Sequence, residues 1–212
     1  MKKIIFTCIV LFLGFACNHL YAQSLKTATA ALEEIDNLSQ FDQLKANHPD
    51  WKVSIDKTLI SDSERFPKIV AAKEGDIIKK QYNPNAPSYV LKVLNIEDEE
   101  LCKLKYIYLD GTKYSKPEID SIRTKIIKRY KEGEKFLTLV NEYTMDGNPT
   151  GDLGWFYKGM MVSEFDDVIQ NRTKGEIFTV DVDENNWFYV VLKNHDNKVE
   201  KAINGIMIRY DK

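Results

Sequence analysis

Residues 151–161 read GDLGWFYKGMM, and this stretch decides which fold the sequence predicts. It combines three glycines and a carboxylate with bulky aromatic side chains and a pair of methionines. The pattern matches neither the helical period nor the alternation of a strand, so it predicts a glycine-rich loop. Together with Phe165, the methionines can form an adaptable apolar cup. The residues alone leave two interpretations open, a binding pocket and plain packing in the core.

The segments on both sides of this stretch predict an α+β fold. The clearest helix start is at Ser115, which can form a capping box with Glu118. Strands are indicated by alternation or by continuous apolar runs such as WFYVVL. In chain order, the predicted elements are a strand at 102–111, helices at 115–133 and 136–143, the glycine-rich stretch, a short helix at 163–172, and strands at 177–182 and 187–192.

The first half of the chain repeats part of this order at an offset of roughly 100 residues. SERFPKIVAAKEGDI resembles SEFDDVIQNRTKGEI, and PSYVLKVLN resembles NWFYVVLKN. The first half contains no GDLG motif, and no strand precedes its leading helix. The closing segment INGIMIRYD resembles the strand LKYIYLDG. One interpretation is that this last strand completes a sheet that the first half cannot finish alone.

The first 22 residues have the pattern of a secretory signal peptide. Two lysines precede an apolar run at 4–17, which is too short to span a bilayer comfortably. We expect cleavage after Ala22 and an exported, periplasmic protein. The alternative is a lipoprotein anchored at Cys17, against which Gly14 counts because a bulky aliphatic residue is usual there. Only a lipidated Cys17 would bring the mature protein into contact with a membrane.

Composition and motifs exclude several classes of partner and cofactor. The formal charge is −2 with acids and bases interleaved, so no basic stripe predicts binding of nucleic acid. Cys102 is the only cysteine after the expected cleavage site, which leaves no intramolecular disulfide. The sequence has no Cys/His cluster and no phosphate loop, so we expect no metal and no cofactor. A calcium-like loop at 181–192 has Asn186 and Leu192 where Gly and Glu are required.

Residues 100–194 resemble the parvulin family of peptidyl-prolyl cis-trans isomerases. The resemblance rests on EGEKFLTLVNEYTMD, GDLGWFYKGMMVSEFDD, KGEI and WFYVVLK, in that order. It implies a parvulin-like four-stranded antiparallel sheet flanked by helices, preceded by a degenerate, partial parvulin-like repeat. The domains that we expect are a signal peptide at 1–22, a degenerate parvulin-like unit at 23–99, a parvulin-type isomerase domain at 100–197 and a C-terminal extra strand at 198–212.

The resemblance also implies a proline-binding site with an apolar and a polar part. The family usually places histidines on its first and last strands, where this sequence has Tyr106 and Tyr189. Asp146 matches the acidic variant of a third polar position. Tyrosines replace both histidines, and the sequence is compatible with either reduced or full isomerase activity. The apolar part matches the family at the three positions expected around a proline ring, namely Leu153, Met161 and Phe165.

The expected function is isomerisation of X-Pro bonds in exported proteins, with unfolded or extended proline-containing chains as partners. Rotation about this bond requires no covalent intermediate, and its barrier is about 18–20 kcal/mol because rotation breaks amide resonance. The twisted amide is less charge-separated than the planar one, so a dry apolar pocket favours it. The alternative function is a catalytically weak or inactive parvulin-like periplasmic chaperone that binds extended client chains.

Overall fold

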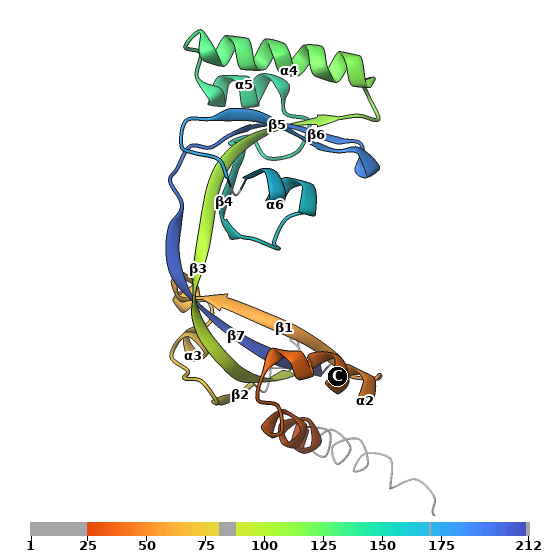
Figure 1. Cartoon of the computed structure of the whole chain (residues 1–212), viewed down its shortest axis with the longest axis vertical. Helices are drawn as coiled ribbons and strands as arrows, with labels where there is room; N and C mark the ends of the chain where they lie inside the picture. The colour runs from red at the N-terminus through yellow and green to blue at the C-terminus, as the bar shows by residue number, and fades with distance from the viewer. Residues whose placement is uncertain (1–24, 81–87, 170, 211–212) are drawn as a thin grey trace, which may run out of the picture. The chain divides into compact units, whose positions relative to one another are not determined.

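The computed structural model of the protein describes residues 25–80, 88–169 and 171–210 (Figure 1). The expected signal peptide, its cleavage site and Cys17 lie outside these residues. The chain divides into two compact units: unit 2 is Glu99–Glu200, and unit 1 combines Met1–Asp98 with Lys201–Lys212. None of the helices within the described ranges has the length and apolar character needed to cross a membrane.

Unit 2 is built on antiparallel strand pairs, and its mixture of strands and helices confirms the predicted α+β class. The long strand β3 (Ser88–Asp110) pairs with β4 (Asp152–Tyr157) and with β6 (Trp187–Leu192). β6 pairs in turn with β5 (Ile177–Val182). The sequence predicts a sheet of four strands for the isomerase domain. The sheet has seven strands in the described chain, because it also includes strands of unit 1.

Helices cover both faces of the sheet in unit 2 (Figure 1). α4 (Lys116–Lys131) and α5 (Phe136–Tyr143) pack on one face, and α6 (Ser163–Ile169) packs on the other. Successive side chains of a strand point to opposite faces. Ile107 and Leu109 of β3 therefore join the core under α4 and α5, whereas Tyr106 and Tyr108 join the core under α6. We call the core under α6, to which Tyr106 and Tyr108 contribute, the α6 cluster.

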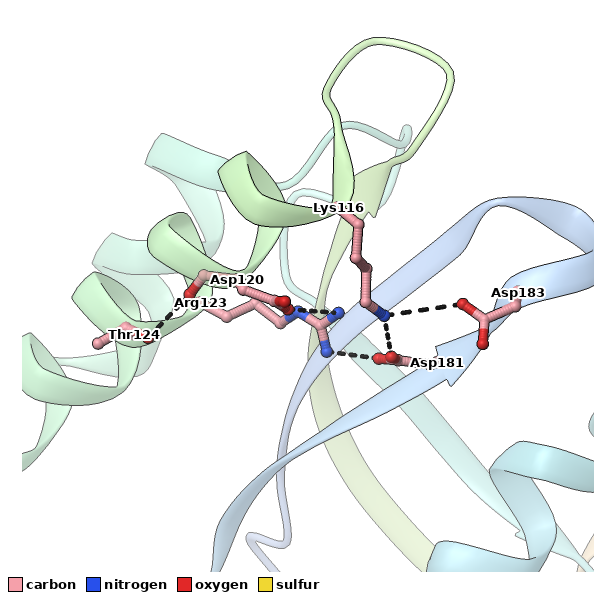
Figure 2. A network of polar contacts seen from close by, with 6 residues as sticks. All are labelled: Lys116, Asp120, Arg123, Thr124, Asp181 and Asp183. Atoms are coloured by element: carbon pink, nitrogen blue, oxygen red, sulfur yellow. Dashed lines mark hydrogen bonds and ion pairs between the residues drawn. The ribbon is translucent and has the colours of Figure 1, made fainter.

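Helix α4 begins where the sequence predicts. Ser115 precedes its first residue, and the Ser115 backbone N–H donates to Glu118 Oε2 at 2.8 Å, as part of a complete capping box. Two basic side chains then tie α4 to β5 (Figure 2). Arg123 is buried, and its Nη1 donates to Asp181 Oδ1 at 2.5 Å. Lys116 donates to the same carboxylate, so α4 has a fixed position on the sheet of unit 2.

The glycine-rich stretch differs from its prediction, because most of it is strand rather than loop. Residues 152–157 form β4, which pairs with Leu101–Lys105 of β3. The pairing shifts register between Lys103 and Lys105, and Gly154 has a φ of 74°. A bulge of this kind interrupts the period-two pattern. The irregular spacing of apolar residues therefore hid the strand from a periodicity argument.

A single strand runs through most of the segment PSYVLKVLN and of the strand predicted at 102–111. β3 runs through both, and the expected domain boundary at residue 99 lies inside it. The intervening residues IEDEEL contain no glycine or proline, so nothing in them ends a strand. Glu97, Asp98 and Glu100 are exposed, and exposed carboxylates are compatible with an extended backbone.

Unit 1 contains its own helices and strands. Residues 25–33 are helical, and β7 (Lys198–Tyr210) pairs antiparallel with β1 (Lys52–Leu59), so the last strand of the chain completes the sheet of unit 1. β7 also neighbours β3, which pairs with β2 (Ile77–Lys80). The remaining elements are η1 (Leu38–Gln40), α2 (Phe41–Asn47), η2 (Ile60–Glu64) and α3 (Pro67–Val70).

Several features of unit 1 recur in unit 2 at an offset of 100 residues. β1 begins at Lys52 and β4 at Asp152. The β2–β3 hairpin pairs Ile77 with Lys92, and the β5–β6 hairpin pairs Ile177 with Leu192. A glycine with positive φ precedes each hairpin, Gly75 at 86° and Gly175 at 97°. The two hairpins therefore share their register and their leading turn.

Candidate functional site

The six side chains predicted to form the site come together on the face of unit 2 that α6 covers. Tyr106 from β3 and Phe165 from α6 are buried members of the α6 cluster. Leu153, Met161 and Tyr189 pack against that cluster and are partly buried. The sixth residue, Asp146, reaches the cluster through a hydrogen bond from Tyr106. The structure thus places the apolar and polar parts of the predicted site side by side.

Tyr189 lies at the centre of an aromatic group. Its ring meets the Phe165 ring edge-to-face, with centroids 5.3 Å apart, and the Tyr106 ring at 5.9 Å. The Tyr108 ring lies 5.5 Å away in a tilted arrangement. Such aromatic pairs fix one another's orientation. Within the described part of the chain, the Tyr189 hydroxyl has no hydrogen-bond partner, so it can bond to a molecule in the site.

The polar part of the site is a closed hydrogen-bond network around Asp146. The Tyr106 hydroxyl donates to Asp146 Oδ2 at 2.6 Å. Asp146 Oδ1 accepts from the Thr144 hydroxyl at 3.0 Å and from the Asn148 backbone N–H at 3.2 Å. The Asn148 side-chain amide donates to the Tyr106 hydroxyl oxygen at 3.3 Å. Asp146 is therefore a fixed acceptor that sets the direction of the Tyr106 hydroxyl.

Three residues of this network were not predicted from the sequence. The Tyr108 backbone N–H donates to the Thr144 hydroxyl at 3.2 Å, which links β3 to the network. The period-two rule could have found Tyr108, which shares a strand face with Tyr106. Thr144 and Asn148 flank Asp146 at two residues on each side, the spacing of local side-chain to backbone turns. That signal is common in loops and does not by itself mark a site.

Gly151 allows β3 and the following loop to approach closely at the site. The Tyr106 backbone N–H donates to the Gly151 carbonyl at 2.8 Å. A Cβ atom at Gly151 would lie 2.4 Å from the Tyr106 carbonyl oxygen, and the residue has a φ of 59°. Both the space and the backbone conformation therefore require glycine at this position. This contact positions the loop that carries Asn148.

Burial keeps the tyrosine hydroxyls protonated. Burial, followed by the hydrogen bond to Asp146, raises the pKa of Tyr106 to about 12. Burial and the nearby Tyr108, Tyr106 and Asp146 raise the pKa of Tyr189 to about 12. The pKa of Tyr108 is also raised, chiefly by burial. All three hydroxyls therefore remain hydrogen-bond donors well above neutral pH.

The raised pKa of Tyr106 predicts a loss of stability in alkali. The folded protein holds this proton up to about pH 12, whereas an unfolded tyrosine releases it near pH 10. Stability is therefore lost as the pH rises from about 10 to about 12. We expect Tyr106→Phe to reduce this loss, as measured by urea unfolding of unit 2 at both ends of that range. Tyr114→Phe, at an exposed position, is the control; an unchanged loss in Tyr106→Phe would contradict the assignment.

The turn before Met161 is held by a buried carboxylate. The Gly159 backbone N–H donates to Asp166 Oδ2 at 2.7 Å, and Asp166 is only 5% exposed. Gly159 has a φ of 96°, a conformation that favours glycine. Asp166 lies next to Phe165 on α6. One side chain therefore fixes the distance between the turn that carries Met161 and the helix that carries Phe165.

Removing this carboxylate should loosen the apolar part of the site. We expect Asp166→Ala to cost about 1–3 kcal/mol in stability, because it leaves the Gly159 N–H without its acceptor. We also expect weaker binding of proline peptides, measured as a several-fold rise in Kd. Asp166→Asn should restore most of both losses, because an amide oxygen can accept the same bond. Equal damage from both substitutions would show that the hydrogen bond to Gly159 is not the cause.

Among residues 25–80, 88–169 and 171–210, no group of His, Cys, Asp and Glu side chains is arranged to hold a metal ion. A shallow hollow on α4 is separate from the predicted site residues, and it is lined by Thr124, Ile127, Lys128, Lys131 and Glu132.

Comparison with known families identifies the fold of this site. A family model described as the PPIC-type PPIASE domain matches residues 89–198, which is more than half of the 212 residues. The chain belongs to the PPIC-type peptidyl-prolyl isomerase family. The family resemblance identified in the sequence is thus confirmed, and the match covers the α6 cluster together with the strands that form it.

Members of this family and related structures match different shares of the chain. A foldase protein PrsA from Halalkalibacterium halodurans is 26% identical over 210 residues, covering 91% of this chain and 60% of that protein. The crystal structure of a PpiC-type peptidyl-prolyl cis-trans isomerase domain is 21% identical with a TM-score of 0.44, covering 48% of this chain and 94% of that one. A structure from a study of SurA-like chaperones of Campylobacter jejuni is 15% identical with a TM-score of 0.38, covering 90% of this chain and 59% of that one. The chain thus spans about 60% of the length of the PrsA relative.

Proposed function

We propose that unit 2 accelerates cis-trans rotation of X-Pro bonds in extended polypeptides. Membership of the PPIC-type family supports this activity. The observation that carries the proposal is that Leu153, Met161 and Phe165 all belong to or pack against one apolar cluster beside the tyrosines. We call these three side chains the proline cup. A proline ring is apolar and compact, so partly buried aliphatic, thioether and aromatic side chains suit it.

The mechanism requires that the site stabilise the twisted amide more than the planar amide. It requires no covalent reaction with the amide. The uncatalysed barrier is about 18–20 kcal/mol. Each 1.4 kcal/mol by which the site favours the twisted form accelerates rotation about tenfold. With the ring held in the cup, the rest of the peptide can turn about the X-Pro bond. An apolar environment favours the twisted amide because that form is less charge-separated than the planar amide.

The polar residues orient the peptide in this proposal. Tyr189 can donate a hydrogen bond to the client backbone, because its hydroxyl has no partner among the described residues. Tyr106 and Asp146 act as positioning residues, because their groups already bond to each other at 2.6 Å. A hydroxyl both donates and accepts hydrogen bonds. Tyrosines can therefore replace histidines in a hydrogen-bond network that transfers no proton to the substrate.

Exchange spectroscopy tests the proposed activity. NMR magnetisation exchange on a proline tetrapeptide measures the cis-trans rate with and without a catalytic amount of the full-length protein. Uncatalysed exchange takes tens to hundreds of seconds, so even weak acceleration is measurable. We expect exchange to become faster in proportion to protein concentration. Exchange that stays at the uncatalysed rate would rule out the isomerase.

A second function, holding extended clients without isomerisation, is favoured by one observation in unit 1. At the constant offset of 100 residues, Ser61 and Arg65 take the places of Met161 and Phe165. We propose that unit 1 is a degenerate copy of unit 2 that lacks the proline cup, with its missing strand supplied by β7. Suppression of light scattering by an aggregating client without prolines tests this function. Met161→Ala should leave that protection unchanged, and an absence of protection in the wild type would contradict it.

The site of action is proposed to be the periplasm, where unfolded exported chains are the partners. The motif at 1–22 supports export, with Cys17 as the alternative anchor. Mass spectrometry of the mature protein distinguishes the two. A free chain that starts at Gln23 supports the signal peptide, and a lipidated Cys17 at the N-terminus supports the lipoprotein. Retention of the whole N-terminus would contradict both.

A further inference from the structure

The shallow hollow on α4 is a surface that the proposed isomerase does not use. Its volume is about 450 Å³, and its lining residues are Thr124, Ile127, Lys128, Lys131 and Glu132. These positions recur three or four residues apart, so their side chains share one side of the helix. We call this surface the α4 hollow. α4 packs on the face of the sheet opposite α6 (Figure 1), so the α4 hollow is separate from the α6 cluster.

Arg129 of α4 holds two carboxylates, one from the turn after the helix and one from α5. Its Nε donates to Glu134 Oε2 at 2.6 Å, and its Nη2 donates to Glu134 Oε1 at 2.7 Å. Its Nη1 donates to Glu142 Oε1 at 2.8 Å. Charge-assisted bonds from an arginine fork are among the stronger hydrogen bonds. One arginine therefore engages both carboxylates, and the lysines of α4 do not share them.

The protein itself compensates the lysines of the α4 hollow only weakly. Lys128 Nζ lies 3.8 Å from Glu132 Oε1, and the two side chains are 73% and 62% exposed. An exposed pair of this kind contributes little. Lys131 and the neighbouring Lys125 are also exposed, and neither forms an ion pair with any other described residue. The α4 hollow thus carries positive charge on a chain whose formal net charge is −2.

We propose that the α4 hollow binds an acidic segment of a partner polypeptide, with carboxylates on Lys128 and Lys131 and an apolar side chain over Ile127. Charge complementarity supports an anionic partner. Ile127 is partly buried against the core under α4 and α5, so it gives the hollow an apolar floor between the lysines. A segment with carboxylates and apolar side chains on one helical face matches this pattern. The surface lies outside the proline cup, so this binding does not depend on isomerisation.

An anionic membrane fits the α4 hollow less well than a polypeptide does. Lipid recognition by basic clusters typically uses about four to eight lysine or arginine residues. The α4 hollow has two lysines in its lining, with Lys125 beside them. Glu132 also lies in the lining, and a uniformly negative bilayer surface would repel its carboxylate. A concave surface accepts a projecting side chain, whereas a bilayer surface is flat.

Binding measurements on the full-length protein test this surface. The probe is a short proline-free peptide with glutamate and leucine at helical spacing, and the reference peptide carries glutamine in place of each glutamate. At low salt we expect Kd to be about fivefold lower for the glutamate peptide, which is about 1 kcal/mol for two exposed ion pairs. The preference should shrink at about 0.5 M salt because of screening. Lys128→Gln combined with Lys131→Gln should reduce it to about twofold or less.

A matched double substitution controls for net charge. Lys113→Gln combined with Lys174→Gln removes the same charge at exposed positions of unit 2 outside the α4 hollow, and it should keep the full preference. Thr124→Glu places a carboxylate at an exposed position in the hollow and should abolish the preference. Equal losses in both double variants, or no preference in the wild type, would overturn the proposal. Binding to phosphatidylglycerol vesicles that requires Lys128 and Lys131, without any preference for the glutamate peptide, would overturn it in favour of a membrane.

Discussion

Met161→Ala is expected to slow catalysed proline exchange by about thirtyfold. The substitution removes the thioether from the proline cup, where Met161 packs partly buried against the α6 cluster. A buried methylene is worth about 0.8 kcal/mol. Loss of three heavy atoms from contact with the ring therefore costs about 2 kcal/mol of transition-state stabilisation. The affected quantity is kcat/KM, because the ring is held both before and during rotation.

The control for this prediction is an equal truncation on the other face of unit 2. Ile122 on α4 packs partly buried against the core under α4 and α5. Ile122→Ala should reduce stability to a similar extent and leave exchange within about twofold of the wild-type rate. The assignment of the proline cup fails if Met161→Ala retains full acceleration, or if both variants lose activity equally.

Asp181→Ala is expected to destabilise unit 2 by about 3 kcal/mol. Arg123 is 3% exposed and depends on Asp181 as its closest anionic partner. Its Nε and Nη2 atoms already have no hydrogen-bond partner among the described residues. Removing one member of a buried ion pair leaves an uncompensated charge, which costs about 3–5 kcal/mol. We expect the lower end of this energy range because one carboxylate still partly compensates the charge: Asp120 Oδ1 remains 3.4 Å from Arg123 Nη2.

A double substitution distinguishes two causes of the lost stability, the uncompensated buried charge and the loss of packing. Arg123→Met combined with Asp181→Ala removes both charges, so it should recover most of the lost stability. Urea unfolding of each variant, followed by Trp155 and Trp187 fluorescence with Trp51 replaced by Phe, measures this in unit 2. A double variant that is less stable than Asp181→Ala would contradict the proposed role of the buried charge.

The pH dependence of the wild type gives an independent check. Partial burial acts to raise the pKa of Asp181, but hydrogen bonds from Arg123 and Lys116 outweigh it and lower the pKa. A carboxylate with a lowered folded-state pKa contributes stability above its unfolded pKa of about 3.9 and loses it as the pH falls. Stability should therefore decline below about pH 4 more steeply in the wild type than in Asp181→Ala.

The apolar part of the site was predictable because its residues lie close together in sequence. Leu153, Met161 and Phe165 fall within 13 residues, and a short turn brings them together. Helix α4 was predictable for a similar reason, since its capping box is local. In each case, side-chain chemistry and spacing determine a structure over a few residues.

The polar network was only partly predictable, because it depends on the path of a loop. Thr144 and Asn148 contact Asp146 locally, whereas Asp146 meets Tyr106 because Gly151 allows the loop to approach β3. Spacing alone does not encode this approach. β4 was hidden by its bulge, and no local pattern indicated that β3 is one continuous strand. The polar network, β4 and the continuous β3 all depend on long-range pairing, which sequence patterns do not specify.

The central claim is that a client's proline ring occupies the cup formed by Leu153, Met161 and Phe165. Methyl NMR on the full-length protein with labelled methionines tests it directly, with a proline tetrapeptide as the ligand. We expect nuclear Overhauser contacts from the Met161 methyl group to the proline ring protons, and none from Met145, which packs on the core under α4 and α5. A peptide that binds with no contact between its proline ring and Met161 would contradict the account.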